Sequence, residues 1–97
     1  MRTLDFPALR HLLGAYLNRD WPEEYGSIEA AVEAYRREAD AARRSSAVSE
    51  IDKLLATLLD VAALAEFVGD LGCAYNFEGA PDGAAGFLKM IRSRISP

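Results

Sequence analysis

The sequence has few of the residues that enzymatic chemistry usually requires. It contains one cysteine, Cys73, and one histidine, His11, so an internal disulfide is impossible and a zinc site would need two carboxylates in addition. Its seven glycines are scattered, and none belongs to a Gly-x-Gly-x-x-Gly or phosphate-cradling loop. We therefore expect no catalytic residue, no metal ion and no cofactor, and we do not expect a small-molecule ligand.

Cys73 and His11 offer the one enzymatic alternative. A thiol beside an imidazole can act as nucleophile and base, as in a hydrolase. One residue of each kind occurs by chance in very many chains, however, and a lone cysteine near a helix end is more often a small apolar side chain. The hydrolase interpretation predicts that blocking the thiol abolishes activity on some substrate.

Long uncharged hydrophobic runs are also missing. The longest candidate, residues 54–68, is interrupted by Asp60 and Glu66, whereas a membrane span needs roughly 20 predominantly apolar residues. No segment resembling a secretory leader opens the chain. We expect one cytoplasmic domain over residues 1–97, without a membrane contact.

Basic residues are in the minority. Fifteen acidic and eleven basic residues give a formal net charge of −4. This charge repels a phosphate backbone, so nucleic acid is not expected to bind directly. A basic protein partner would instead be attracted and would meet the chain faster.

Apolar residues recur at helical spacing in five segments, and none alternates with the period of two that a strand requires. The sequence therefore predicts an all-α fold, a small bundle of about five helices. The expected helices cover residues 7–18, residues 28 to somewhere before Ser45, the segment that starts at Ser49, residues 61–71 and a last helix after Asp82.

Local residue types set the expected helix ends. Ser27, Asp60 and Asp82 suit N-cap positions, and Gly72 suits the left-handed residue that follows a helix. A continuous helix through Asp60 is the competing interpretation. Residues 19–26 are expected to form a connector because Pro22 disfavours helical geometry at the preceding residue. Residues 39–49 are expected to be the most mobile segment, and residues 73–82 to form a loop.

Two stretches of sequence resemble a known family. The first reads Leu9-Arg10-His11-Leu12-Leu13-Gly14-Ala15-Tyr16-Leu17-Asn18-Arg19-Asp20-Trp21-Pro22-Glu23-Glu24-Tyr25-Gly26-Ser27, and the second reads Leu71-Gly72-Cys73-Ala74-Tyr75. Together they are similar to motifs of the contact-dependent growth inhibition immunity proteins, with Asn18 where that family often has histidine. The resemblance extends from about residue 4 to residue 95.

The resemblance implies a function that needs only binding. Such a protein would neutralise a cognate toxin domain, often a nuclease, by one-to-one association inside the bacterial cell. The alternative without catalysis is a small helical adaptor or regulatory subunit of an endogenous protein. A toxin gene immediately upstream would distinguish the two.

Exposed acidic residues are the candidates for partner binding. Those on the predicted helices lie outside the motifs that hold the fold, and Glu23 and Glu24 border the first group of them. Trp21, by contrast, is expected to pack between helices and to stabilise the fold. Two acidic pairs, Glu29 with Glu33 and Glu66 with Asp70, are spaced to share one face of a helix. The candidate residues are Glu23, Glu24, Glu29, Glu33, Asp40, Glu66 and Asp70.

Overall fold

The computed structural model describes residues 2–57, 60–75 and 82–96, and every regular element in these ranges is helical. A 3₁₀ turn, η1 (Thr3–Asp5), precedes α1 (Pro7–Tyr16), α2 (Trp21–Tyr25), α3 (Ile28–Glu38), α4 (Ala41–Ala56), α5 (Val61–Asp70) and α6 (Gly83–Ile95). The predicted all-α fold is confirmed. Five of the described helices have at least 10 residues, and α2, with 5 residues, is the short additional one.

Three of the predicted helix ends are confirmed. The Ser27 hydroxyl accepts a hydrogen bond of 3.1 Å from the backbone N–H three residues later, and the Asp60 carboxylate does the same at 2.7 Å. Asp60 has extended backbone angles (φ −71°, ψ 171°), so α4 and α5 are separate helices. Gly72 follows α5 with φ +109°, a conformation that favours glycine. Asp82 does occupy the N-cap position of α6, but its side chain makes no capping hydrogen bond.

The connector predicted over residues 19–26 contains a helix, which corrects that part of the sequence interpretation. Trp21 and Pro22 are the first two residues of α2. Proline is tolerated in the first turn of a helix, where its missing N–H would lack an intrahelical partner. Gly26 then ends the helix with φ +80°.

The segment predicted to be mobile, residues 39–49, is also helical over most of its length. Only Ala39 and Asp40 separate α3 from α4. The Asp40 carboxylate accepts a 2.8 Å hydrogen bond from Arg43 N and so caps the start of α4. Ser49, predicted to begin a helix, lies inside α4. Among residues 41–49 only Ala47 is buried, so this part of the helix shows almost no hydrophobic stripe.

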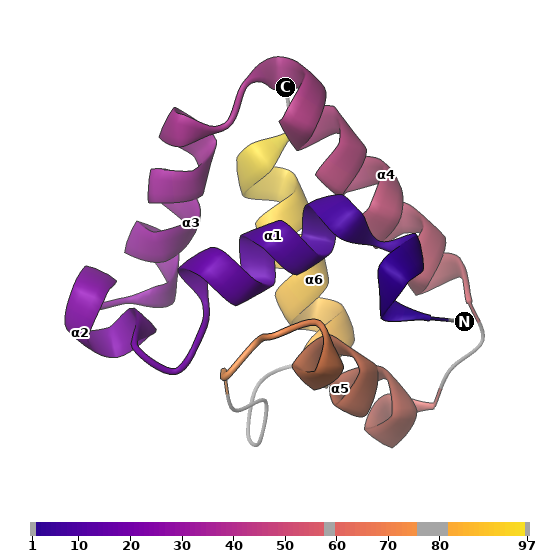
Figure 1. Ribbon diagram of the computed structural model, residues 1–97. Coiled ribbons are helices and arrows are strands. Elements are labelled where there is room, and N and C mark those ends of the chain that lie inside the picture. Colours follow the sequence, from indigo (N-terminus) through magenta and orange to yellow (C-terminus); the bar gives the residue numbers. More distant parts are fainter. Residues whose placement is uncertain (1, 58–59, 76–81, 97) are drawn as a thin grey trace.

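The helix α6 lies at the centre of the fold and packs against α3, α4 and α5, while α1 crosses it in the view of Figure 1 and packs against α3 and α4. The inward residues predicted for the last helix are buried there, and all of them are aliphatic or aromatic: Phe87, Leu88, Ile91 and Ile95. Charged residues stay on the outside. Among the described residues, no polar or charged residue is fully buried.

The two stretches that carry the family resemblance meet in space. A Cβ added at Gly72 would lie only 2.9 Å from the Gly14 Cα, so the backbones of α1 and of the segment after α5 touch there. Beside this contact, Ala74 N donates a 2.8 Å hydrogen bond to the carbonyl oxygen of Leu17. Trp21, which we predicted to pack between helices, is half-buried against the core, with its ring centroid 6.3 Å from that of a tyrosine in the segment after α5. These motif residues therefore join the first third of the chain to its second half.

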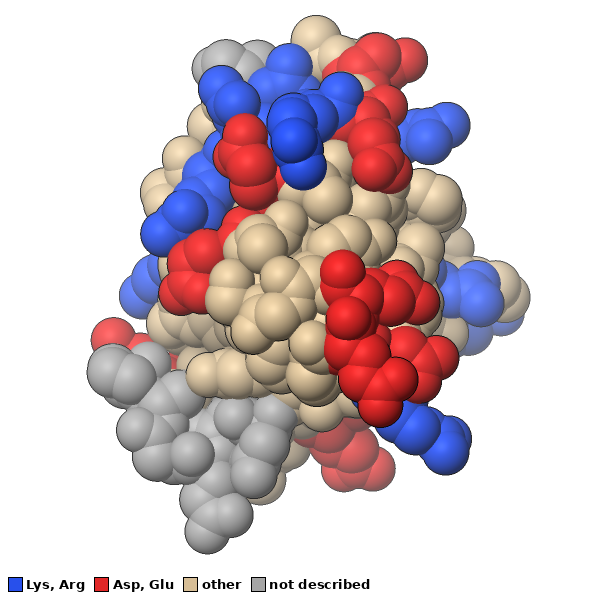
Figure 2. All heavy atoms as spheres, turned by 90° about the vertical axis from the view of Figure 1, so that its left-hand side faces the viewer, with Lys and Arg blue, Asp and Glu red and all other residues tan. Residues whose placement is uncertain are grey.

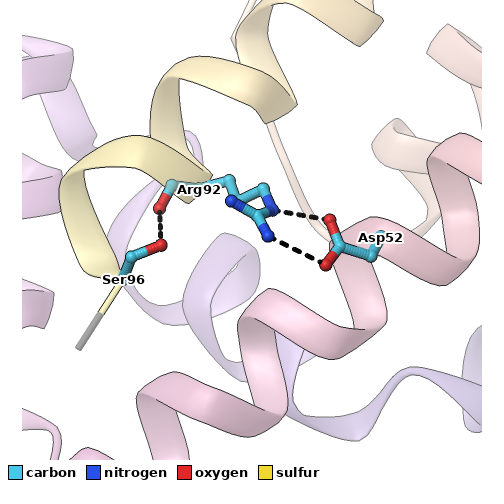
Figure 3. Close-up of polar contacts among 3 residues, drawn as sticks. All are labelled: Asp52, Arg92 and Ser96. Carbon is cyan, nitrogen blue, oxygen red and sulfur yellow. Dashed lines mark hydrogen bonds and ion pairs between the residues drawn. The ribbon is translucent and has the colours of Figure 1, made fainter.

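A bidentate ion pair connects α6 to α4 at the surface (Figure 3). Arg92 Nε donates to one oxygen of Asp52 at 2.6 Å, and Nη2 of the same guanidinium donates to the other oxygen at 3.1 Å. The hydrogen-bonded guanidinium holds the pKa of the Asp52 carboxyl below its usual value. The Ser96 hydroxyl donates to the Arg92 carbonyl at 2.8 Å and closes the end of α6.

Candidate functional site

All seven candidate acidic residues are exposed, but they do not share one surface. Glu23 and Glu24 lie on α2 and Glu29 and Glu33 on α3, two helices that pack together; we call these four residues the α2–α3 acidic surface. Figure 2 shows the side of the molecule that carries these helices, with a group of adjacent acidic side chains to the right of its centre and a group of basic side chains above it. The remaining acidic pair lies on α5, in a different part of the molecule (Figure 1).

Glu66 and Asp70 are both exposed on α5, as their spacing predicts. No other candidate acidic residue lies on that helix. Glu33, on the larger surface, forms an ion pair of 3.4 Å with Arg36, and both side chains are about half exposed. An exposed pair of this kind adds little stability, so Glu33 is able to exchange this partner for another.

The predicted helix from residue 28 to somewhere before Ser45 would place Asp40 on a helix face, and the structure shows that this is wrong. Asp40 stands in the two-residue link between α3 and α4, where one carboxylate oxygen caps α4. The side chain is nevertheless exposed. Its charge therefore lies at the end of the bundle where α3 ends and α4 begins.

An aromatic cluster, formed by His11, Tyr16, Tyr25 and Tyr35, joins α1, α2 and α3. The Tyr16 ring stacks on Tyr25 at 6.1 Å and meets Tyr35 edge-on at 5.4 Å, while His11 lies 6.1 Å from Tyr16. The Tyr16 hydroxyl donates a 2.5 Å hydrogen bond to a carboxylate oxygen at the end of α3. Burial, reinforced by this hydrogen bond, raises the pKa of Tyr16 to about 12.

A groove of about 580 Å³ opens between the first turns of α1 and residues 42–50 of α4. We call it the α1–α4 groove. Another hollow in the described part of the chain, between α5 and α6, has a volume of only about 90 Å³. The residues that line the α1–α4 groove are Pro7, Ala8 and His11 from α1, Asp40 from the link, and Ala42, Arg43, Ser46 and Glu50 from α4.

Glu50 sets the geometry of this groove. Its two carboxylate oxygens accept hydrogen bonds from Ala8 N at 3.1 Å and Leu9 N at 2.9 Å, at the N-terminus of α1. Phe6, the residue at the N-cap position of α1, makes no capping hydrogen bond through its own side chain. A carboxylate from a helix 41 residues away therefore satisfies the first N–H groups of α1, where the helix dipole favours a negative charge.

Apart from Asp40, the groove was not among our sequence-based candidates. Its walls come from segments about 40 residues apart, and no local pattern indicates that they meet. The only signal is that Phe6 is a poor N-cap residue, which implies that a distant side chain caps α1.

Cys73 does not have the environment of a nucleophile. Its side chain is buried, and burial raises the pKa of the thiol to about 11. Nucleophilic cysteines have a lowered pKa, because the thiolate is the reactive form. His11 is exposed and packs against tyrosine rings.

In the ranges that the structure describes, no three His, Cys, Asp or Glu side chains converge as a metal ion would require. Within the same ranges, none of the helices has the length and hydrophobicity of a membrane span.

Comparison with known families assigns the chain. The family model described as CdiI immunity protein matches residues 5–95, which is nearly the whole chain. The chain belongs to the CdiI immunity protein family. No curated protein matches it.

A solved structure agrees with this assignment. The CdiI family member described here is similar to a chain in the crystal structure of a CdiA-CT/CdiI complex from Y. kristensenii, with 28% sequence identity and a TM-score of 0.86. The match covers 94% of this chain and 98% of that one, so the two folds agree almost from end to end.

Proposed function

We propose that this chain is an immunity protein that binds one toxin domain and neutralises it as a one-to-one complex. The observation that carries the proposal is the match, over 94% of the chain, to a structure solved as a CdiA-CT/CdiI complex. Inhibition by binding requires no catalytic group. It is consistent with a buried, protonated Cys73 and an exposed His11.

We further propose that the toxin is a nuclease with a basic substrate-binding surface. The net charge of −4 and the α2–α3 acidic surface would attract such a surface, and the immunity protein would then cover the region that otherwise binds nucleic acid. The complex would form in the cytoplasm, where a nuclease toxin finds its substrate.

The test begins with a search for a toxin gene next to the gene of this chain and uses the toxin domain that it encodes. Co-expression should protect growth, and the purified mixture should elute as one complex with the mass of one copy of each protein. The isolated toxin domain should cleave RNA or DNA, and this chain should stop the cleavage. A toxin domain that binds and is neutralised but cleaves neither nucleic acid would disprove only the nuclease assignment. Failure to bind or protect would disprove the immunity function and favour the adaptor alternative.

Charge reversal distinguishes the two acidic surfaces. Exposed ion pairs contribute only about 0 to 1 kcal/mol each, so charge should appear mainly in the association rate. We expect Glu29→Lys with Glu33→Lys to slow association with the toxin domain, and the matched double variant Glu66→Lys with Asp70→Lys to change it less. The α2–α3 surface is preferred because four of the candidate residues lie on it.

The salt dependence supplies the control. Association of the unmodified chain should slow as salt rises, since the range of the field shrinks to about 8 Å at physiological ionic strength. Equal rates for both double variants and no effect of salt would show that the acidic surfaces serve only solubility.

A further inference from the structure

We propose that the α1–α4 groove receives a projecting segment of the toxin domain that carries a lysine or arginine side chain, and that Asp40 binds this side chain. The inference rests on the proposed function, because it assumes that a toxin domain is the partner. In this inference, contacts in the groove hold the complex together and slow its dissociation. The α2–α3 acidic surface only raises the rate of association.

The size of the groove fits a protruding segment. Its volume of about 580 Å³ is comparable with the roughly 300 to 1,000 Å³ of pockets that bind small ligands. The groove is largely open to solvent, so it suits side chains on a partner's loop better than a small molecule. Pro7 and Ala8 give one wall an apolar surface, while Ser46 and Asp40 give the other side polar groups. A long basic side chain combines an apolar stem with a charged end and matches both.

The charges that line the groove favour a cation. The lining contains two carboxylates, Asp40 and Glu50, one guanidinium, Arg43, and one imidazole, His11. Both oxygens of Glu50 already accept backbone N–H groups, and its charge remains beside the groove. Asp40 is exposed and uses only one carboxylate oxygen, for Arg43 N, within the described part of the chain. We assign its second oxygen as the acceptor for the partner's basic side chain, and a charge-assisted bond of this kind is stronger than a neutral one.

Side-chain packing connects the groove to α2, the helix that carries Glu23 and Glu24. His11 lines the groove and also belongs to the aromatic cluster, which extends through Tyr16 to Tyr25 on α2. Tyr25 is half-buried, and tyrosine is enriched among the residues that dominate binding energy at protein interfaces. Tyr16 and Tyr35 are buried, so His11 and Tyr25 are the members of the cluster that a toxin domain on α2 could contact next to the groove.

Two N-cap aspartates provide a matched pair for testing the role of charge. Asp40 and Asp60 have nearly the same backbone angles, and each caps its helix through the N–H three residues later, at 2.8 and 2.7 Å. Asparagine caps helices as well as aspartate does but has no charge. We expect Asp40→Asn to weaken binding of the cognate toxin domain by about tenfold, mainly through faster dissociation, and Asp60→Asn to leave it unchanged. Both variants should melt alike.

Two adjacent serines provide a second pair, which tests occupancy of the groove. Ser45 and Ser46 are both exposed on α4, and only Ser46 lines the groove. Ser46→Trp should fill the groove and weaken binding by at least about 100-fold, whereas Ser45→Trp should weaken it less than about threefold, as expected for a site outside the buried part of an interface. Surface plasmon resonance with the immobilised toxin domain measures all four variants against the unmodified chain.

The outcomes separate this inference from the proposed function. In one outcome, the unmodified chain neutralises the toxin domain, and Asp40→Asn and Ser46→Trp bind it as tightly as the unmodified chain does. The groove is then empty in the complex, so the inference is wrong while the immunity function stands. Equal losses in Ser45→Trp and Ser46→Trp would also overturn it, because the effect would not depend on the groove. If the unmodified chain does not bind the toxin domain, the proposed function itself fails.

Discussion

Replacing Gly72 by alanine tests the contact that joins the two motif-bearing stretches. The residue has φ +109°, and an added Cβ would lie 2.9 Å from Gly14 Cα and 3.3 Å from Gly14 N. The unfavourable conformation costs about 1 to 2 kcal/mol for a residue with a Cβ. The overlap with backbone atoms adds to this, because α1 must move away and loosen the packing around it, as in other overpacked sites that cost about 1 to 3 kcal/mol. We expect Gly72→Ala to lower the free energy of unfolding by about 2 to 5 kcal/mol in total.

Two other glycines separate the conformational cost from the overlap. Gly26 has φ +80° with nothing within 4 Å of the added Cβ, so Gly26→Ala should cost only about 1 to 2 kcal/mol. Gly69 lies within α5, also with nothing within 4 Å, and Gly69→Ala should stabilise the protein by about 0.5 to 1 kcal/mol through helix propensity. The three variants therefore differ in sign as well as in size.

Urea melts followed by circular dichroism at the helical band measure all three free energies. Because about 1 kcal/mol shifts the melting temperature of a domain this small by roughly 4 to 8 °C, thermal melts should show the same order. If Gly72→Ala costs no more than Gly26→Ala, the backbone contact with Gly14 does not constrain the fold, and our account of the two motifs is wrong.

Three further predictions concern single side chains. Glu50→Ala should destabilise the protein by about 1 to 2 kcal/mol in urea melts, since it removes the acceptor for two N–H groups of α1. Glu50→Gln should destabilise it less, because one amide oxygen remains as an acceptor. Trp21→Ala should lower the free energy of unfolding by about 2 kcal/mol. This is below the roughly 3 to 5 kcal/mol typical of a fully buried large aromatic, because the side chain is only half-buried. An unchanged melt with lost toxin binding would instead make Trp21 a binding residue. The pKa of Tyr16 is raised in the folded state, so its contribution to stability is complete below pH 10 and is lost as the pH rises towards 12. Stability should therefore fall over that range, and Tyr16→Phe should reduce the fall; an identical pH profile for both proteins would contradict this.

Helices with a strong hydrophobic stripe or a good cap were predictable from the sequence. Ser27 and Asp60 mark the starts of α3 and α5 because their side chains accept local backbone hydrogen bonds. The start of α4 was missed, although Asp40 is an equally good cap. The reason is that, in the turns that follow, Ala47 is the one buried residue among residues 41–49. Burial of a single small residue leaves no periodic signal to detect.

The candidate site was predictable only in part. Exposure of the acidic residues follows from their charge and helical spacing, and it is confirmed for Glu29 and Glu66 among others. Which of them lie together depends on the packing of α2 on α3, and the groove depends on Glu50 reaching the N-terminus of α1. Both are tertiary contacts between segments whose local sequences are compatible with many arrangements.

The stoichiometry of toxin inhibition tests the central claim most directly. A fixed amount of the cognate toxin domain, well above the dissociation constant, is titrated with the purified chain while its activity is recorded. We predict a linear loss of activity that reaches zero at one equivalent of the chain, because a binding inhibitor is consumed as it acts. Persistent activity at many equivalents would contradict the immunity function, and full inhibition at a small fraction of one equivalent would show that the chain acts as a catalyst.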